Sequence, residues 1–248
     1  MSRPFPFMAL VLTGVALSTA ACSRTGESPA ADEVARSTQD WSKLGQFDAI
    51  ESTGPDNVVV KIGDRIAISA DGDPKAVADL DIRTKNGKLI ISRKAKGDWN
   101  WSNRTDKGAT VHVTMPAIRA AELTGAGDFD LDRAGGDSLA LSLTGAGNFR
   151  VAAVTLKSLT TDITGAGSMK IAGTADTAKF SITGAGDIDA EALKVGTAVV
   201  SILGAGDIDF ASDGKVAISI MGPGDVTVKG KAQCTTSGVG PGEAHCAP

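Results

Sequence analysis

The chain has 248 residues, a formal net charge of −4, 30 Gly, no Tyr and only two His. An acidic chain without a basic cluster excludes a nucleic-acid-binding protein, and an aromatic content of 4% is thin for a catalytic domain. A hydrophobic content of 42% excludes disorder over the whole length.

Residues 1–21 have the pattern of a secretory signal peptide. Arg3 precedes an apolar run from Phe5 to Leu17, and small residues follow that run. The run is too short to span a bilayer comfortably. The pattern therefore predicts export and removal of this segment.

Cys22 directly follows the small residues, and residues 17–22 resemble a bacterial lipobox. The resemblance implies that Cys22 is lipidated, and Ser23 in place of Asp implies an outer-membrane address. Thr19 departs from the pattern, because Leu is usual there. The alternative is cleavage after Ala21 without a lipid, which gives a periplasmic or secreted protein. The only membrane contact that we expect is the lipid anchor.

Residues 22–45 are mostly small and polar, which predicts a flexible tether between the anchor and the folded body. A short helix over 31–41 is the alternative.

Residues 46–116 predict an irregular N-terminal part that caps the end of the fold. The tripeptide 54–56 separates two alternating runs, and Asn86-Gly87 joins two short strands as a β-hairpin. A further alternating strand ends at Pro116. Between them, the polar segment 97–108 holds the candidate ligand-binding residues, since exposed Trp often marks a contact site; the alternative is a Trp that folds back onto the body. These residues are Trp99, Trp101 and Arg104.

Residues 117–233 contain a repeat whose period is about 20 residues. Its marker is the tripeptide Gly-Ala-Gly, replaced by Gly-Pro-Gly in the last copies. The copies in this range start at Gly125, Gly145, Gly165, Gly184, Gly204 and Gly222, and a further Gly-Pro-Gly starts at Gly240 in the tail.

On both sides of each tripeptide, apolar and polar residues alternate, which is typical of strands with one buried face. A unit this short cannot bury its own apolar side, whereas stacked copies can. The sequence therefore predicts an all-β fold, a single-stranded parallel β-helix (β-solenoid) with a right-handed coil. Each turn is a strand, a glycine corner and a second strand. The corner glycines indicate either a positive φ or a lack of room for a Cβ atom.

Cys234 and Cys246 flank a Gly/Pro-rich stretch and predict a tail over 234–248 that a disulfide closes. Two free thiols are the alternative.

An acidic row follows the corners. Asp187 and Asp207 would lie about 5 Å apart in adjacent turns. A bound cation would relieve their repulsion, which makes them weak metal candidates, but we favour solvated residues that cap the turns. We expect no resident metal and no cofactor, because neither His112 nor His245 has a partner at metal-ligand spacing.

Four features together resemble the bacterial domain family called putative auto-transporter adhesin, head GIN domain. They are the opening Phe47 to Ile50 with the Gly54 corner, the run 86–91, the strand 111–113 with Pro116, and the run 123–128 with its later copies. The resemblance implies a single solenoid-like domain over 46–248, an exported location and no catalytic residues.

We therefore expect a non-enzymatic, adhesin-like surface module whose ligand the sequence does not name. A structural envelope protein that binds only protein partners is the alternative. A glycan-active β-helix enzyme is a distant alternative, because nothing in the sequence raises the pKa of one carboxyl in a pair.

Overall fold

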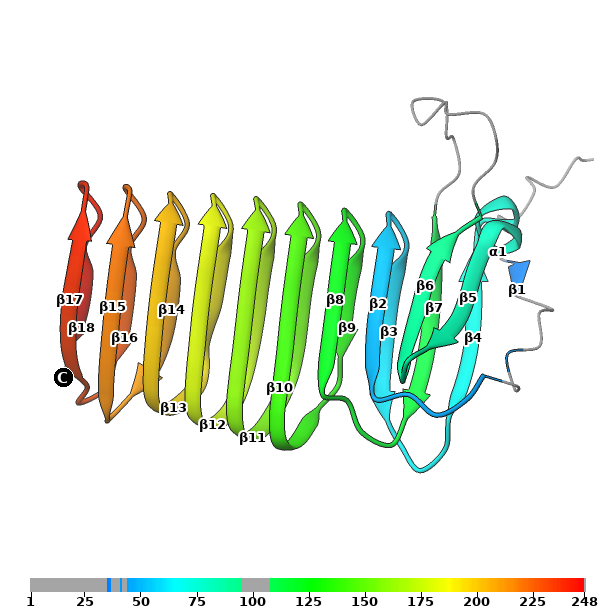
Figure 1. The fold of residues 1–248 in the computed structure, drawn as a ribbon, viewed down its shortest axis with the longest axis horizontal. Coiled ribbons are helices and arrows are strands. Elements are labelled where there is room, and N and C mark those ends of the chain that lie inside the picture. The colour runs from blue at the N-terminus through cyan, green and yellow to red at the C-terminus, as the bar shows by residue number, and fades with distance from the viewer. Residues whose placement is uncertain (1–34, 37–40, 42–43, 95–107, 248) are drawn as a thin grey trace, which may run out of the picture. The chain divides into compact units, whose positions relative to one another are not determined.

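A computed structural model of the chain describes residues 35–36, 41, 44–94 and 108–247 (Figure 1). All of these described residues belong to one compact unit. The elements in chain order are β1 (Ala35–Arg36), β2 (Ala49–Gly54), β3 (Asn57–Ile62), β4 (Ala67–Gly72), α1 (Pro74–Asp79), β5 (Leu80–Lys85), β6 (Lys88–Arg93), β7 (Ala109–Met115), β8 (Ala120–Gly125), β9 (Asp128–Leu131), β10 (Ala134–Gly145), β11 (Asn148–Gly165), β12 (Ser168–Gly184), β13 (Asp187–Gly204), β14 (Ile208–Ser212), β15 (Lys215–Met221), β16 (Val226–Lys229), β17 (Gln233–Val239) and β18 (Ala244–Ala247).

The repeat forms a β-solenoid with roughly 20 residues per turn, which confirms the predicted fold class. Strands one turn apart pair in parallel, and the corner glycines lie in register: Gly125 opposes Gly145, which opposes Gly165. We call each turn a coil. Figure 1 shows the coils side by side, each with one strand toward the viewer and a second strand behind it.

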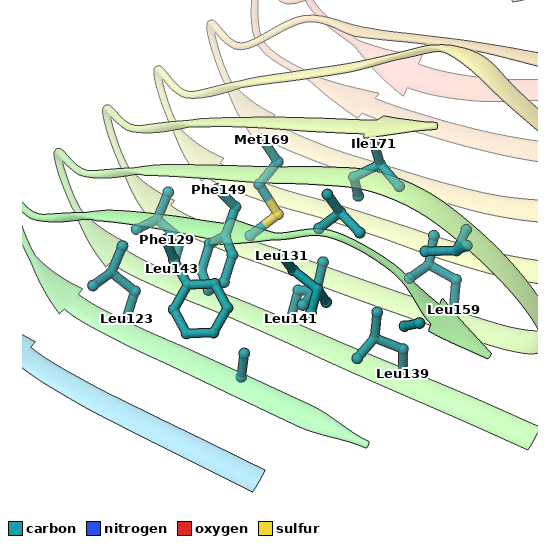
Figure 2. Close-up of a cluster of buried hydrophobic side chains, with 14 of the residues drawn as sticks. Leu123, Phe129, Leu131, Leu139, Leu141, Leu143, Phe149, Leu159, Met169 and Ile171 are labelled. Carbon is teal, nitrogen blue, oxygen red and sulfur yellow. The ribbon is translucent and has the colours of Figure 1, made fainter. Parts of the chain in front are cut away.

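The alternating apolar residues form continuous columns inside the coils, as the sequence predicts. Leu123 and Leu143 are at most 1% exposed, and Leu143 opposes Ile163 in the next coil. Phe129 and Phe149 stack in adjacent coils with ring centroids 4.8 Å apart (Figure 2). Because every coil adds one member to each column, no coil can be buried without its neighbours.

The corner glycines are required for both of the predicted reasons. The first glycine of each corner has a φ between +125° and +137°, which L side chains rarely adopt. A Cβ atom on Gly165 would also lie 2.2 Å from the carbonyl oxygen of Gly145. The third glycine, such as Gly167, has an ordinary φ but would place its Cβ 2.2 Å from the oxygen of Gly147. From the second corner onward, successive corners therefore stack too closely for a side chain at the first or third position.

The N-terminal part differs from the irregular cap that we predicted over 46–116. Strands β2 and β3 form a regular coil, since Gly54 opposes Gly125 and Val58 opposes Phe129. Asp56 replaces the third glycine of this corner. The cap consists instead of the residues that follow β3 in the sequence.

Within the cap, β6 and β7 pair in parallel with β2 and β3 and thereby extend the solenoid beyond its first coil. The antiparallel strands β5 and β4 lie outside them, and α1 buries Ala76 and Val77. The predicted hairpin is confirmed: β5 and β6 are antiparallel, and both Asn86 and Gly87 have positive φ.

The predicted tether over 22–45 is wrong for its last part. Strand β1 pairs with β4, so that Ala35 opposes Gly72, and Trp41 is only 9% exposed. Strand pairing attaches Ala35–Arg36 to the cap, where the chain is extended rather than helical, and the indole of Trp41 is buried in the core.

The C-terminal tail contains the predicted disulfide, and its residues form a further coil of the solenoid. Strands β17 and β18 pair in parallel with β15 and β16 and flank the corner 240–242. Cys234 and Cys246 take the register positions of Val216 and Val228, and their disulfide crosses from one strand to the other. The other inward positions hold Thr236, Gly238 and Ala244, which bury little apolar surface.

We expect the disulfide to hold the last coil closed. Replacing both cysteines by Ser should cost about 3 kcal/mol, because the crosslink restricts the unfolded chain and few apolar contacts replace it. Hydrogen exchange by mass spectrometry should show faster exchange over 233–247 and unchanged exchange over 120–200. The double variant Cys234→Val with Cys246→Val controls for packing. Slow exchange over 233–247 in both variants would contradict this expectation.

Candidate binding surface

The predicted Trp site lies outside the described residues, as does Cys22. The structure does describe the two ends of the segment that carries Trp99, Trp101 and Arg104. There the Arg93 guanidinium donates through Nε to Asp56 Oδ2 at 2.7 Å, and Asp56 Oδ1 accepts from the backbone N–H of Ala109 at 2.8 Å. Both charged side chains are at most 5% exposed. Asp56 therefore joins the strands that precede and follow the segment.

The acidic row at the corners binds backbone amides. The carboxylate of Asp187 accepts a hydrogen bond from the backbone N–H of Asp207 at 3.0 Å, and Asp207 accepts from Asp225 at 2.8 Å. Asp225 in turn accepts from Glu243 at 2.8 Å. Each carboxylate thus caps the next coil, which accounts for Asp187 and Asp207 without a cation. Among the described residues, no group of three or more His, Cys, Asp or Glu could hold a metal ion.

The outward face of the strands after the corners carries ion pairs. Arg150 bonds to Asp130 at 2.8 Å, and Lys170 bonds to Asp189 in the next coil. The hydrogen bond from Lys170 is the main cause that lowers the pKa of Asp189 below its ordinary value. A carboxyl group that serves as the general acid of a glycosidase needs a raised pKa instead. The contact between Lys170 and Asp189 stabilises the fold at pH values above the ordinary pKa of Asp189. This stabilisation is lost as the pH falls through the lowered pKa of Asp189 in the folded protein.

The two His side chains each contact one carboxylate. His112 Nε2 lies 2.9 Å from Asp71 Oδ2, and His245 Nε2 lies 3.4 Å from Glu243 Oε2. Each side chain is about half exposed and lies at the surface of a strand. Both contacts are surface ion pairs of the ordinary kind when the imidazole is protonated.

The outward face of the strands before the corners changes character along the solenoid. Near the cap it is charged: Lys88 bonds to Glu122 at 2.8 Å and to Glu51 at 3.1 Å. The hydrogen bond to Glu122 is the main cause that raises the pKa of Lys88. Further along, Asp162 and Lys179 are the charged residues that point outward.

At the three outward positions nearest the corner, the last three coils carry no charge, and we call these positions the uncharged face. Lys215 lies on β15 one outward position further from the corner. The uncharged face contains all of the exposed large hydrophobic side chains among the described residues. Val199, Leu203 and Met221 are 54%, 52% and 51% exposed, and Val239 is 79% exposed. The members are Val199, Ser201, Leu203, Ala217, Ser219, Met221, Thr235, Ser237 and Val239.

The position directly before the first corner glycine gives this face its apolar edge. In the preceding coils that position is Thr, as in Thr144, Thr164 and Thr183, and it changes to Leu203, Met221 and Val239. This change from Thr to a larger apolar residue is visible in the sequence, but only when the outward positions are aligned as well as the buried ones. An exposed apolar row on a regular sheet is an unusual surface for a protein to keep without a use.

The comparison with protein families identifies the chain. Residues 46–232 match the family described as putative auto-transporter adhesin, head GIN domain. The chain belongs to this family. No curated protein matches it significantly.

Solved structures resemble the GIN domain in fold. A putative adhesin from Bacteroides fragilis has a TM-score of 0.75 at 23% identity, over 86% of this chain and 98% of the other. A putative lipid binding protein from Parabacteroides distasonis has a TM-score of 0.67 at 18% identity, over 87% and 96%. A putative adhesin from Parabacteroides merdae has a TM-score of 0.63 at 17% identity, over 87% and 96%.

The names of the family and of these three structures describe adhesins or a lipid-binding protein, and none describes an enzyme. At these identities the structures establish the fold and leave the ligand open. In the described part of the chain, no helix has the length and apolarity needed to cross a membrane.

Proposed function

We propose that this protein is a non-enzymatic surface-binding module of the bacterial cell envelope, and that its ligand contacts the uncharged face. One observation carries the proposal: in the part of the chain that the structure describes, all four exposed large hydrophobic side chains lie on adjacent strands of a single sheet. One row of Ser lies between a row of Leu, Met and Val and a row of Val, Ala and Thr. Such a face suits a ligand without charge, such as a neutral glycan or an apolar protein surface.

The family supports the adhesin-like part of the proposal, and the surface chemistry supports the class of ligand. Ionic ligands would leave their charges unpaired on this face, which is costly where water is excluded. The corner carboxylates are already bonded to backbone amides and the opposite face is already ion-paired, so neither offers an equivalent apolar contact.

The test replaces the apolar residue before each of the last three corners by Thr, which the chain has at this position in its other coils. In the triple variant Leu203→Thr, Met221→Thr and Val239→Thr we expect adhesion of expressing cells under flow to fall to the level of a deletion strain. The free energy of unfolding should change by less than about 1 kcal/mol, because these side chains are exposed. A matched control replaces Asp130, Arg150 and Lys170 by Thr on the opposite face. Normal adhesion by the triple variant would refute the role of the uncharged face.

A structural envelope protein with protein partners only is the second candidate. The outer edges of β17 and β18, which pair with no strand among the described residues, favour it, since open strand edges bind other strands. Pull-down of crosslinked envelope complexes, compared with flow adhesion of the deletion strain, separates the two candidates. Adhesion at the parent level with loss of a protein complex would support this second candidate.

We further propose that residues 1–21 are a secretory signal and that Cys22 receives the lipid that anchors the protein to the outer membrane. Metabolic labelling with a fatty acid tests this address. The parent chain should take up label and Cys22→Ser should not. An unlabelled parent chain would instead indicate a periplasmic or secreted protein.

A further inference from the structure

The C-terminal end of the solenoid has two open strand edges. Strand β17 pairs with β15, and β18 pairs with β16, each along one side only. Within the described ranges no strand pairs with their other sides, and Figure 1 shows these strands at the end of the row of coils.

Two hydrogen bonds show which backbone groups of β17 face the open side. The N–H of Gln233 donates to the carbonyl of Gly214, and the carbonyl of Val239 accepts from Gly222. Backbone groups of successive strand residues point to opposite sides, so the odd-numbered residues of β17 bond to β15. The even-numbered residues, Cys234, Thr236 and Gly238, therefore present their N–H and C=O groups to the open side.

The same reasoning applies to β18. The carbonyl of Glu243 accepts from the N–H of Val226, so Glu243 and His245 face β16. Ala244 and Cys246 consequently direct their backbone groups to the open side.

Exposed strand edges are usually protected by charge, proline or a covering element. Among the described residues, no strand or helix covers this end. Strand β17 contains neither a charged residue nor a proline. At the opposite end, the outermost strand β5 carries Asp81, Arg83 and Lys85, and α1 covers the core. One end of the solenoid is thus protected against strand pairing and the other is suited to it.

We propose that two copies of this chain associate through their C-terminal ends, with the open edges of β17 and β18 paired to those of the second copy. A partner must offer two strand edges at once, because the open edges belong to opposite walls of one coil that a disulfide and a glycine corner hold together. The same end of a second copy offers that spacing. A two-fold axis perpendicular to the solenoid makes each new strand pair antiparallel, and the covered N-terminal ends stop growth at two copies.

Sedimentation equilibrium of the full chain tests this inference. Every sample carries Cys22→Ser, so that no lipid contributes to association, and keeps the disulfide. At concentrations up to about 100 µM we expect the parent to have twice the mass of one chain. Thr236→Pro should have half that mass, because proline removes an N–H that faces the open side and leaves the bonds to β15 intact.

A control variant separates the end from the uncharged face, and so from the proposed function. Val199→Lys with Ser201→Lys changes the positions that align with Thr235 and Ser237 two coils away, and it should retain the doubled mass. Hydrogen exchange over 120–200 must match the parent in every variant. If Thr236→Pro fails to fold, Ala244→Pro carries the same test on β18.

Three results would overturn the inference. They are a parent with the mass of one chain, a folded edge variant that keeps the doubled mass, and a control variant that loses it. Polymers larger than two chains would also contradict it, because they would require pairing at the capped end. Amide exchange supplies an independent readout: the amides of Thr236 and Gly238 should exchange at least about tenfold more slowly in the associated state.

Discussion

Replacing Gly165 by Ala is expected to lower the free energy of unfolding by about 4 kcal/mol, which is a large effect for one methyl group. The substitution forces a φ of +131° on a residue with a Cβ atom and brings that atom to 2.2 Å from the carbonyl oxygen of Gly145. Backbone strain of this kind costs about 1–3 kcal/mol, and overpacking against a neighbour that cannot move adds a similar amount. Urea unfolding followed by circular dichroism measures the difference.

Gly54 provides the matched control for this variant. It occupies the same corner position with a φ of +125°, but a Cβ atom there would meet nothing within 4 Å. Gly54→Ala should therefore cost about 1–3 kcal/mol, the strain alone. Equal losses for the two variants would show that the close stacking of corners does not limit stability.

Replacing Phe149 by Ala should cost about 3–5 kcal/mol, because a fully buried ring leaves a cavity that the stacked coils cannot collapse to fill. Its ring contacts Phe129, and its register neighbour in the next coil is Met169. Thermal and urea unfolding of the variant measure this loss.

Phe149→Met is the control, since it copies the residue that the next coil uses in the same column. A swap that nearly conserves volume should cost less than about 1.5 kcal/mol. A loss of similar size in both variants would mean that ring contact, rather than filled volume, stabilises this column.

The regular coils could be predicted from the sequence because two independent signals coincide there. The glycine spacing locates the corners, and the alternation assigns each residue to the inside or outside, as Leu143 and Phe149 illustrate. Stacking then follows from the inability of one coil to bury its own columns. The hairpin at Asn86-Gly87 could be predicted for a different reason, since that dipeptide itself favours a two-residue hairpin turn.

The first coil could not be recognised in this way. Its corner has Asp56 where the other corners have glycine, and the reason is a buried ion pair with Arg93, which lies 37 residues away in the sequence. Only the folded cap brings those two residues together. The last coil could not be distinguished from a disulfide-closed tail because its inward residues are small, although its Gly-Pro-Gly corner continues the repeat.

Side-chain patterns locate the uncharged face only when the outward positions are aligned as carefully as the buried ones. The change from Thr183 to Leu203 at one register position is visible in the sequence. The open edges of β17 and β18 are different, because the direction of backbone groups follows from the hydrogen bonds between coils. No composition or motif encodes them.

The position of the first coil also bears on the order in which the molecule assembles. From Gly145 to Gly165 the chain travels 20 residues between paired corners, but from Gly54 to Gly125 it travels 125 − 54 = 71. Closing the longer segment costs about 1 kcal/mol more in chain entropy, at about 0.6 kcal/mol per doubling of length. Pairing of neighbouring coils is therefore favoured in the middle of the molecule. The strand pairing between β2 and β8 is expected to form late in folding. If folding stopped before this pairing formed, the cap and the regular coils would be folded but separate from each other.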